Sequence, residues 1–156
     1  MSKPSARKPL VLATGYETSL TRTVISAALA VIGIIWIAVY INLAEDAATY
    51  TPGLGKKPDN PIPFMADLEK WNFLIGFGLI FLGLVIAAHK KTPLGRGRGV
   101  VVGMLGCFLI GLVWIVLYYF TGSDSPIPVM KDLGQYNLMV GIAFMATGFA
   151  YATKWE

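Results

Sequence analysis

Four stretches of this chain contain no Asp, Glu, Lys, Arg or His, and each is long enough to cross a lipid bilayer. They cover residues 23–44, 71–88, 99–123 and 133–153. A bilayer core of about 30 Å needs roughly 20 helical residues. Because a segment in lipid must pair its own backbone groups, such long apolar stretches form helices. The sequence therefore predicts an all-α membrane protein with four transmembrane helices.

Basic residues predict the orientation of these helices. Of the 13 Lys and Arg residues, nine lie in the terminal segments or between the second and third stretches. By the positive-inside rule, both termini and this middle segment are cytoplasmic. The net charge of +4 therefore reflects sidedness, and it is not a nucleic-acid signature. The nine residues are Lys3, Arg7, Lys8, Arg22, Lys90, Lys91, Arg96, Arg98 and Lys154.

The chain also repeats itself. Gly33, Trp36 and Tyr40 recur 78 positions later as Gly111, Trp114 and Tyr118. A second pattern recurs with an offset of 65, and its first copy comprises Pro61, Ile62, Pro63, Met65, Asp67, Leu68, Asn72, Gly76 and Gly83. We interpret the chain as a duplicated unit. Each copy is expected to be a helical hairpin, and the two hairpins share one orientation as a parallel internal repeat.

The predicted organisation has four parts. Residues 1–21 form a flexible basic cytoplasmic tail, and 22–91 form the first hairpin with a long outer loop over 45–70. A cytoplasmic linker over 92–98 leads to the second hairpin, 99–156, with a short outer loop over 123–135. The difference between the two offsets places a 13-residue insertion in the outer loop of the first copy.

Small residues on the first helix of each hairpin predict close helix packing. Copy two places them every four residues, and copy one places them on a neighbouring face. We hypothesise that the two stripes pack against each other, as in a fused dimer; contact with a partner's helix is the alternative. With the Trp of each repeat, the predicted packing residues are Ser26, Ala30, Gly33, Trp36, Gly103, Cys107, Gly111 and Trp114.

The segment PIP[FV]MxDLxx[WY]N is the most specific pattern of the chain. Its prolines are expected to hold an extended entry, its Asp to cap or start the next helix, and its aromatic residue to mark the outer interface. Its Asn can satisfy helix-end groups or bridge two helices. A structural cap and a partner-docking surface are both open for Pro61, Pro63, Asp67, Trp71, Asn72, Pro126, Pro128, Asp132, Tyr136 and Asn137.

Catalysis finds little support in the sequence. His89 is the single histidine, and no Ser/His/Asp set, HExxH motif or Cys/His metal cluster can be assembled. We therefore expect no enzymatic activity, cofactor or metal. A small four-helix transporter is the alternative, but ion coupling usually requires an ionisable residue within the membrane. An adaptor that works through its surfaces, or another membrane scaffold, fits better.

The second half of the chain resembles the actinobacterial CrgA family of cell-division proteins. The similarity lies in FLIGLVWIVLYYFTG, PIPVMKDLGQYN and VGIAFMATGFAYATKWE, with Gly111 and Trp114 in the core, Tyr136 and Asn137 as the aromatic-Asn pair, and a TxW ending. The first copy has the core variant GIIW and the pair Trp71 and Asn72, but it lacks the TxW ending.

The resemblance implies a membrane adaptor or regulator of septum formation, located in the plasma membrane and enriched at the septum. It also implies partners, namely FtsZ, FtsQ-type proteins and septal penicillin-binding proteins. Family members are typically single hairpins, so the tandem unit departs from the usual pattern. The basic tail is expected to meet the ring machinery, while the outer loops and helix surfaces meet the synthases, the bilayer or a second copy.

Overall fold

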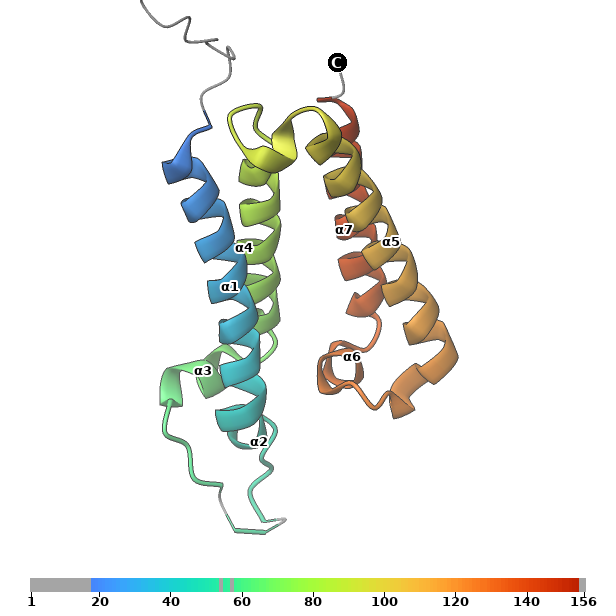
Figure 1. The fold of residues 1–156 in the computed structure, drawn as a ribbon. Coiled ribbons are helices and arrows are strands. Elements are labelled where there is room, and N and C mark those ends of the chain that lie inside the picture. Colours follow the sequence, from blue (N-terminus) through green and yellow to red (C-terminus); the bar gives the residue numbers. More distant parts are fainter. Residues whose placement is uncertain (1–17, 54, 57, 155–156) are drawn as a thin grey trace, which may run out of the picture.

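The computed structural model describes residues 18–53, 55–56 and 58–154, and all regular elements within these ranges are helical. The predicted tail, with Lys3, Arg7 and Lys8, lies almost entirely outside the described residues. Four long helices dominate the chain (Figure 1). The all-α fold class is thereby confirmed.

The long helices differ in length between the first and second arm of each hairpin. The first arms have 24 residues each and are long and apolar enough to cross a membrane, whereas the second arms have 17. The long helices are α1 (Leu20–Leu43), α4 (Trp71–Ala87), α5 (Arg98–Thr121) and α7 (Tyr136–Ala152). The short elements are α2 (Glu45–Ala48), α3 (Pro63–Leu68), η1 (Pro93–Gly95), η2 (Gly122–Asp124) and α6 (Pro128–Leu133).

The helices form two hairpins that lie side by side. Helix α1 packs along α4, α5 packs along α7, and the hairpins meet through α4 and α7. In Figure 1 the start of α1, the η1 segment and the end of α7 lie at one end, which we call the linker end. Helices α2, α3 and α6 lie at the opposite end, which we call the loop end (Figure 1).

The prolines of the repeated segment start short helices. We expected an extended entry, and this is wrong from the second proline onward: Pro63 begins α3 and Pro128 begins α6. Proline suits the first helical position because its missing N–H would have no intrahelical partner there and its φ is already helical. Asp67 and Asp132 consequently lie inside these short helices, and neither caps the long helix that follows.

Paired glycines bring the two arms of each hairpin into backbone contact. A Cβ added to Gly33 would collide with the carbonyl oxygen of Gly76, and one added to Gly111 would lie 2.6 Å from the oxygen of Gly141. Just beyond, Ile37 covers Gly76 and Ile115 covers Gly141 in the same way. The two hairpins thus use the same packing at equivalent positions.

The hypothesis that the two small-residue stripes pack against each other is wrong. The backbone of Ser26 and Ala30 lies against Gly83 of α4, whereas Gly103 lies against the ring of Tyr151 on α7. Each stripe is filled by the returning helix of its own hairpin. The space that the fused-dimer hypothesis required is therefore already occupied.

Aromatic side chains join the two hairpins. The ring centroids of Phe81 and Phe144 are 4.9 Å apart, and those of Phe77 and Trp114 are 5.8 Å apart. Nearer the linker end, the hydroxyl of Tyr151 donates to the carbonyl oxygen of Leu84 at 3.0 Å. This hydrogen bond crosses from one copy to the other.

In copy two, Gly103 and Cys107 of the small-residue stripe accommodate Tyr151. The ring packs over Gly103 and forms a buried cluster with Cys107. Copy one has Ile25 and Leu29 at the corresponding positions of α1. The stripe thus makes room for a side chain that reaches the other hairpin.

We expect Gly111→Ala to lower the thermal unfolding temperature of the purified chain in mild detergent. The added methyl would press on the oxygen of Gly141, and such overpacking costs about 1–3 kcal/mol. Gly106→Ala is the matched control on the same helix, since its added Cβ meets no atom within 4 Å. It should leave stability unchanged or raise it by up to about 1 kcal/mol. Circular dichroism checks both, and equal behaviour of the two variants would contradict the close contact.

Candidate functional site

A buried asparagine locks the loop end of each hairpin. The Asn72 amide nitrogen donates to the carbonyl oxygens of Met65 at 2.7 Å and Glu69 at 2.8 Å. In copy two the Asn137 nitrogen donates to Met130 at 2.6 Å and Gly134 at 2.8 Å. Both side chains are 0% exposed. Each asparagine therefore ties a short helix to the start of the long helix that follows it.

The asparagine lock pairs backbone carbonyls at the short helices. A six-residue helix leaves most of its carbonyls without intrahelical partners, and leaving such groups buried and unpaired is costly. The amide supplies two donors at that point. Asn72 and Asn137 were candidates for partner docking, but their full burial gives them a structural position within the fold.

The two locks differ in their tryptophan. In copy two, the indole N–H of Trp114 donates to the amide oxygen of Asn137 at 3.2 Å. In copy one, Trp36 Nε1 and Asn72 Oδ1 are both enclosed and have no hydrogen-bond partner among the described residues. The Trp36 ring instead lies 6.1 Å from that of Phe64, centroid to centroid. Copy one therefore carries an incomplete version of the network.

Copy one also carries backbone strain where copy two has glycine. Glu69 follows α3 with φ 45° and ψ −127°, and its counterpart Gly134 has φ 51° and ψ −124°. Glycine adopts this conformation without steric cost, whereas a residue with a Cβ does not. Glycine therefore suits this turn in copy two, whereas in copy one Glu69 adopts the same backbone conformation at a steric cost.

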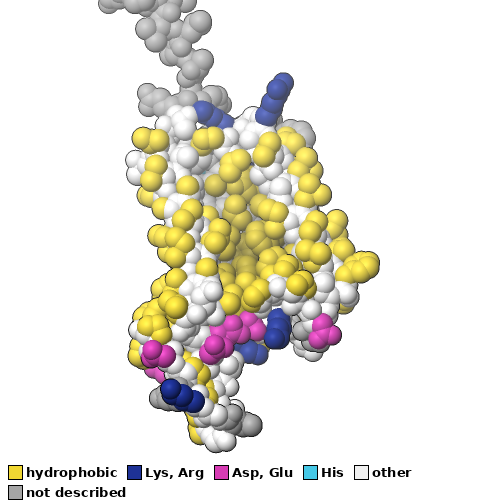
Figure 2. All heavy atoms as spheres, turned by 60° about the horizontal axis from the view of Figure 1, so that its bottom comes forward, with side chains coloured by type: hydrophobic (Ala, Val, Ile, Leu, Met, Phe, Trp, Pro, Cys, Tyr) yellow, Lys and Arg dark blue, Asp and Glu magenta, His cyan; other side chains and the backbone are white. Residues whose placement is uncertain are grey.

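The remaining residues of the repeated segment form an exposed face at the loop end. Trp71 is 65% exposed and Tyr136 is 56% exposed. Figure 2 shows acidic and basic side chains gathered at this end, next to a largely apolar surface over the long helices. Of the predicted docking residues, Pro61, Pro63, Asp67, Pro126 and Pro128 are exposed and Asp132 is partly buried.

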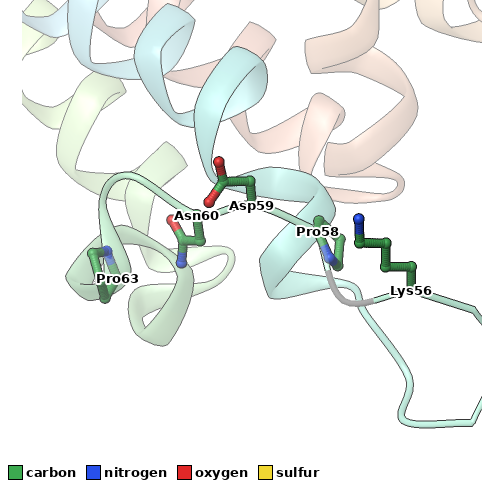
Figure 3. A pocket seen from close by; sticks show the side chains of 5 residues that line it. All are labelled: Lys56, Pro58, Asp59, Asn60 and Pro63. Atoms are coloured by element: carbon green, nitrogen blue, oxygen red, sulfur yellow. The ribbon is translucent and has the colours of Figure 1, made fainter.

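The insertion in copy one forms part of an open hollow at the loop end. Lys56, Pro58, Asp59, Asn60 and Pro63 line it (Figure 3). The Asn60 side chain accepts a hydrogen bond from the Ile62 backbone N–H at 3.0 Å, which shapes the turn into α3. Among the described residues there is no group of three or more side chains that could hold a metal ion.

The linker end is compact and basic. The backbone N–H of Ser19 donates to the carbonyl of Lys91 at 2.8 Å, so the start of α1 is held against the linker. Arg96 donates to the hydroxyl of Thr18, and Thr92 donates to the carbonyls of Ala87 and His89.

His89 is surrounded by cations at this end. Desolvation and the charges of Arg22, Lys91, Lys90 and Lys154 lower the pKa of His89 below its ordinary value. The imidazole is therefore mainly neutral at pH 7, and lysine and arginine provide the positive charge.

Comparison with known proteins agrees with this doubled architecture. The model of the family described as Cell division protein CrgA matches the chain twice, over residues 2–91 and 88–156. The chain belongs to the CrgA family. It is 42% identical to Cell division protein CrgA of Bifidobacterium longum over 117 residues, which cover 74% of this chain and 93% of the relative. Its identity to the Streptomyces avermitilis CrgA is 43% over 66 residues, covering 42% of this chain and 75% of the relative.

Membership of the CrgA family gives the chain a role in cell division. The two family matches are consistent with a tandem duplication of the family's unit. No solved structure matches the chain. The resemblance inferred from the sequence is thus confirmed.

Sequence reasoning missed the roles of three residues: Tyr151 bonds across the two hairpins, Glu69 holds a strained turn, and Glu45 lies near Asp132 of the other copy. Tyr151, Glu45 and Glu69 each lie outside the positions that the two copies share. A difference between the copies was the available signal: Tyr151 aligns with Ile86 and Glu69 with Gly134 at the offset of 65. Glu45 lies at the start of the longer loop and has no such counterpart to compare with.

We expect Trp114→Phe to be more destabilising than Trp36→Phe. Both changes remove the same volume, but only the first breaks a hydrogen bond and leaves the Asn137 oxygen unpaired. The difference should be about 1–3 kcal/mol. Thermal unfolding of the two variants in the same detergent measures it. Equal losses would show that the Trp114 bond contributes nothing to stability.

Proposed function

We propose that this chain is a non-enzymatic membrane adaptor that links the FtsZ ring to septal peptidoglycan synthesis. The observation that carries the proposal is the double match to a cell-division family, combined with exposed faces at both ends of the helix pair. An adaptor requires separated surfaces and a rigid body between them.

The proposed setting is the plasma membrane, which all four long helices cross. In the apolar windows of α1 and α5, only 22% and 17% of the residues are buried inside the protein. Apolar surface of this extent is costly in water and favourable in lipid. Helices α4 and α7 have 17 residues each, which gives roughly 26 Å at about 1.5 Å per residue. That length approaches the bilayer core of about 30 Å.

The linker end is the proposed cytoplasmic side. It carries Arg22, Lys90, Lys91, Arg96 and Arg98 close to the ends of the long helices. Basic residues flanking membrane helices favour the cytoplasm. Helix α1 begins at this end, and the predicted basic tail that precedes it, residues 1–21, is the proposed contact for the ring machinery.

The loop end is the proposed site for FtsQ-type and penicillin-binding partners. Trp71 and Tyr136 are exposed there at equivalent positions of the two copies, and the prolines at the start of α3 and α6 hold both segments in defined positions. Exposed aromatic residues beside rigid turns suit protein contacts. Two such faces in one chain permit two simultaneous contacts, and self-association remains a further use of the lipid-facing surfaces.

We expect the loop end to react with reagents outside the cell and the linker end to stay protected. Thr51→Cys and Lys90→Cys, each in a Cys107→Ala background, place a thiol at an exposed position of either end. A membrane-impermeant maleimide applied to intact cells should label the first variant only. Permeabilised cells provide the control, since both variants should then react. The reverse labelling pattern would contradict the proposed orientation.

We expect septal localisation to depend on both ends. Deleting residues 1–17 should weaken contact with the ring, while combined Trp71→Ala and Tyr136→Ala should reduce pull-down of septal synthases at least several-fold. Phe120→Ala is the control, because this residue is 84% exposed but outside the repeated segment. A fluorescent fusion during division gives the localisation. Unchanged localisation and pull-down in the combined deletion and double variant would defeat the adaptor assignment.

A further inference from the structure

The two hairpins meet at the loop end through an apolar contact with two acids beside it. Tyr40 and Ala44 at the end of α1 share one buried cluster with Leu133 of α6. Glu45 directly follows Ala44, and Asp132 directly precedes Leu133. One carboxyl from each copy is therefore placed at the junction between the hairpins.

These two carboxyls interact with each other. The Glu45 and Asp132 side chains lie within hydrogen-bonding reach of each other. A hydrogen bond between two carboxyls requires one of them to carry a proton. Asp132 is partly buried, and its Oδ2 atom is enclosed and has no hydrogen-bond partner among the described residues. A protonated Glu45 carboxyl has an O–H group that can donate to this oxygen. An ionised Glu45 leaves two like charges at a partly buried contact.

The other charged and titratable groups around the pair come from four elements. Tyr40 of α1 faces Glu45, Asp132 and Glu69, so its phenol lies among three acids. Lys131 is a cation that acts on Glu45, and Asp46 is a further acid on α2. Asp46 and Lys131 thus act on Glu45, while Glu69 acts on Tyr40.

Burial, the hydrogen bond to Asp132 and the charges of Asp132 and Asp46 raise the pKa of Glu45 to about 7, against the opposing effect of Lys131. The ordinary value is 4.5. An acid whose pKa is raised by folding favours the folded contact while protonated. Its contribution is complete below pH 4.5 and is lost as the pH rises through about 7.

We propose that Glu45 and Asp132 form a proton-dependent joint between the two hairpins. While the pair holds a proton, the carboxyls bond and the loop ends of the hairpins stay together. When both carboxyls are ionised, their repulsion loosens this end. The contacts of Tyr151 and the aromatic pairs hold the hairpins together further along, so the joint changes the separation at the loop end without dividing the protein.

The duplication supplies a matched control for this joint. Asp67 is the copy-one counterpart of Asp132, but its side chain is exposed. Asp67→Asn removes the same charge at the equivalent position. It should leave the joint unaffected.

The experiment measures the separation of the loop ends in the full chain in lipid nanodiscs. Spin labels are attached at Leu43→Cys and Phe120→Cys, which are exposed near the ends of α1 and α5, in a Cys107→Ala background. Electron–electron resonance distances are recorded from pH 5 to pH 9. We expect a narrow distribution at low pH that becomes broader and longer with a midpoint near pH 7.

Glu45→Gln separates the proposal from a general effect of pH. Its amide still hydrogen-bonds but cannot ionise, so the distribution should stay narrow at both extremes, while Asp67→Asn should follow the parent chain. In glutamate-labelled protein, carbon NMR should also show one resonance titrating near pH 7 that is missing in Glu45→Gln. A distance that does not change with pH, or a pH response retained in Glu45→Gln, would overturn the proposal.

Discussion

The fold depends on backbone contact between the arms of each hairpin. Gly33 lies on Gly76 and Gly111 lies on Gly141, so the helix axes approach without side chains between them. In lipid, close packing of this kind replaces the hydrophobic effect as the main source of helix association. The neighbouring Ile37 and Ile115 pack over Gly76 and Gly141 at these same contacts.

The asparagine lock and the glycine contact are the two structural features that both copies share. Both copies bury an asparagine at the same place and use it on equivalent carbonyls. Copy two completes the network with Trp114, and it has glycine where copy one strains Glu69. Copy two is thus the more relaxed version of the hairpin, and copy one departs from it near its longer loop.

The sequence predicted the elements better than it predicted their partners. The absence of charge located the long helices to within a few residues, since 23–44 became Leu20–Leu43 and 99–123 became Arg98–Thr121. Hydropathy could not say which helix fills each small-residue stripe, because this depends on the three-dimensional pairing of distant segments. The contact of Tyr151 with Leu84 likewise has no local pattern, and the helices begun by Pro63 and Pro128 are too short to show a periodicity.

The compact linker has a consequence for assembly. Separate hairpins would dissociate, exchange and pair with identical copies, whereas the covalent linker keeps these two in one chain. The start of α1 is held against Lys91 beside this linker. The pair therefore has fixed one-to-one stoichiometry and no subunit exchange. Under that condition Tyr151 packs against copy one and does not have to fit against a second Tyr151. The two halves can therefore differ in sequence, like the two subunits of a permanent heterodimer.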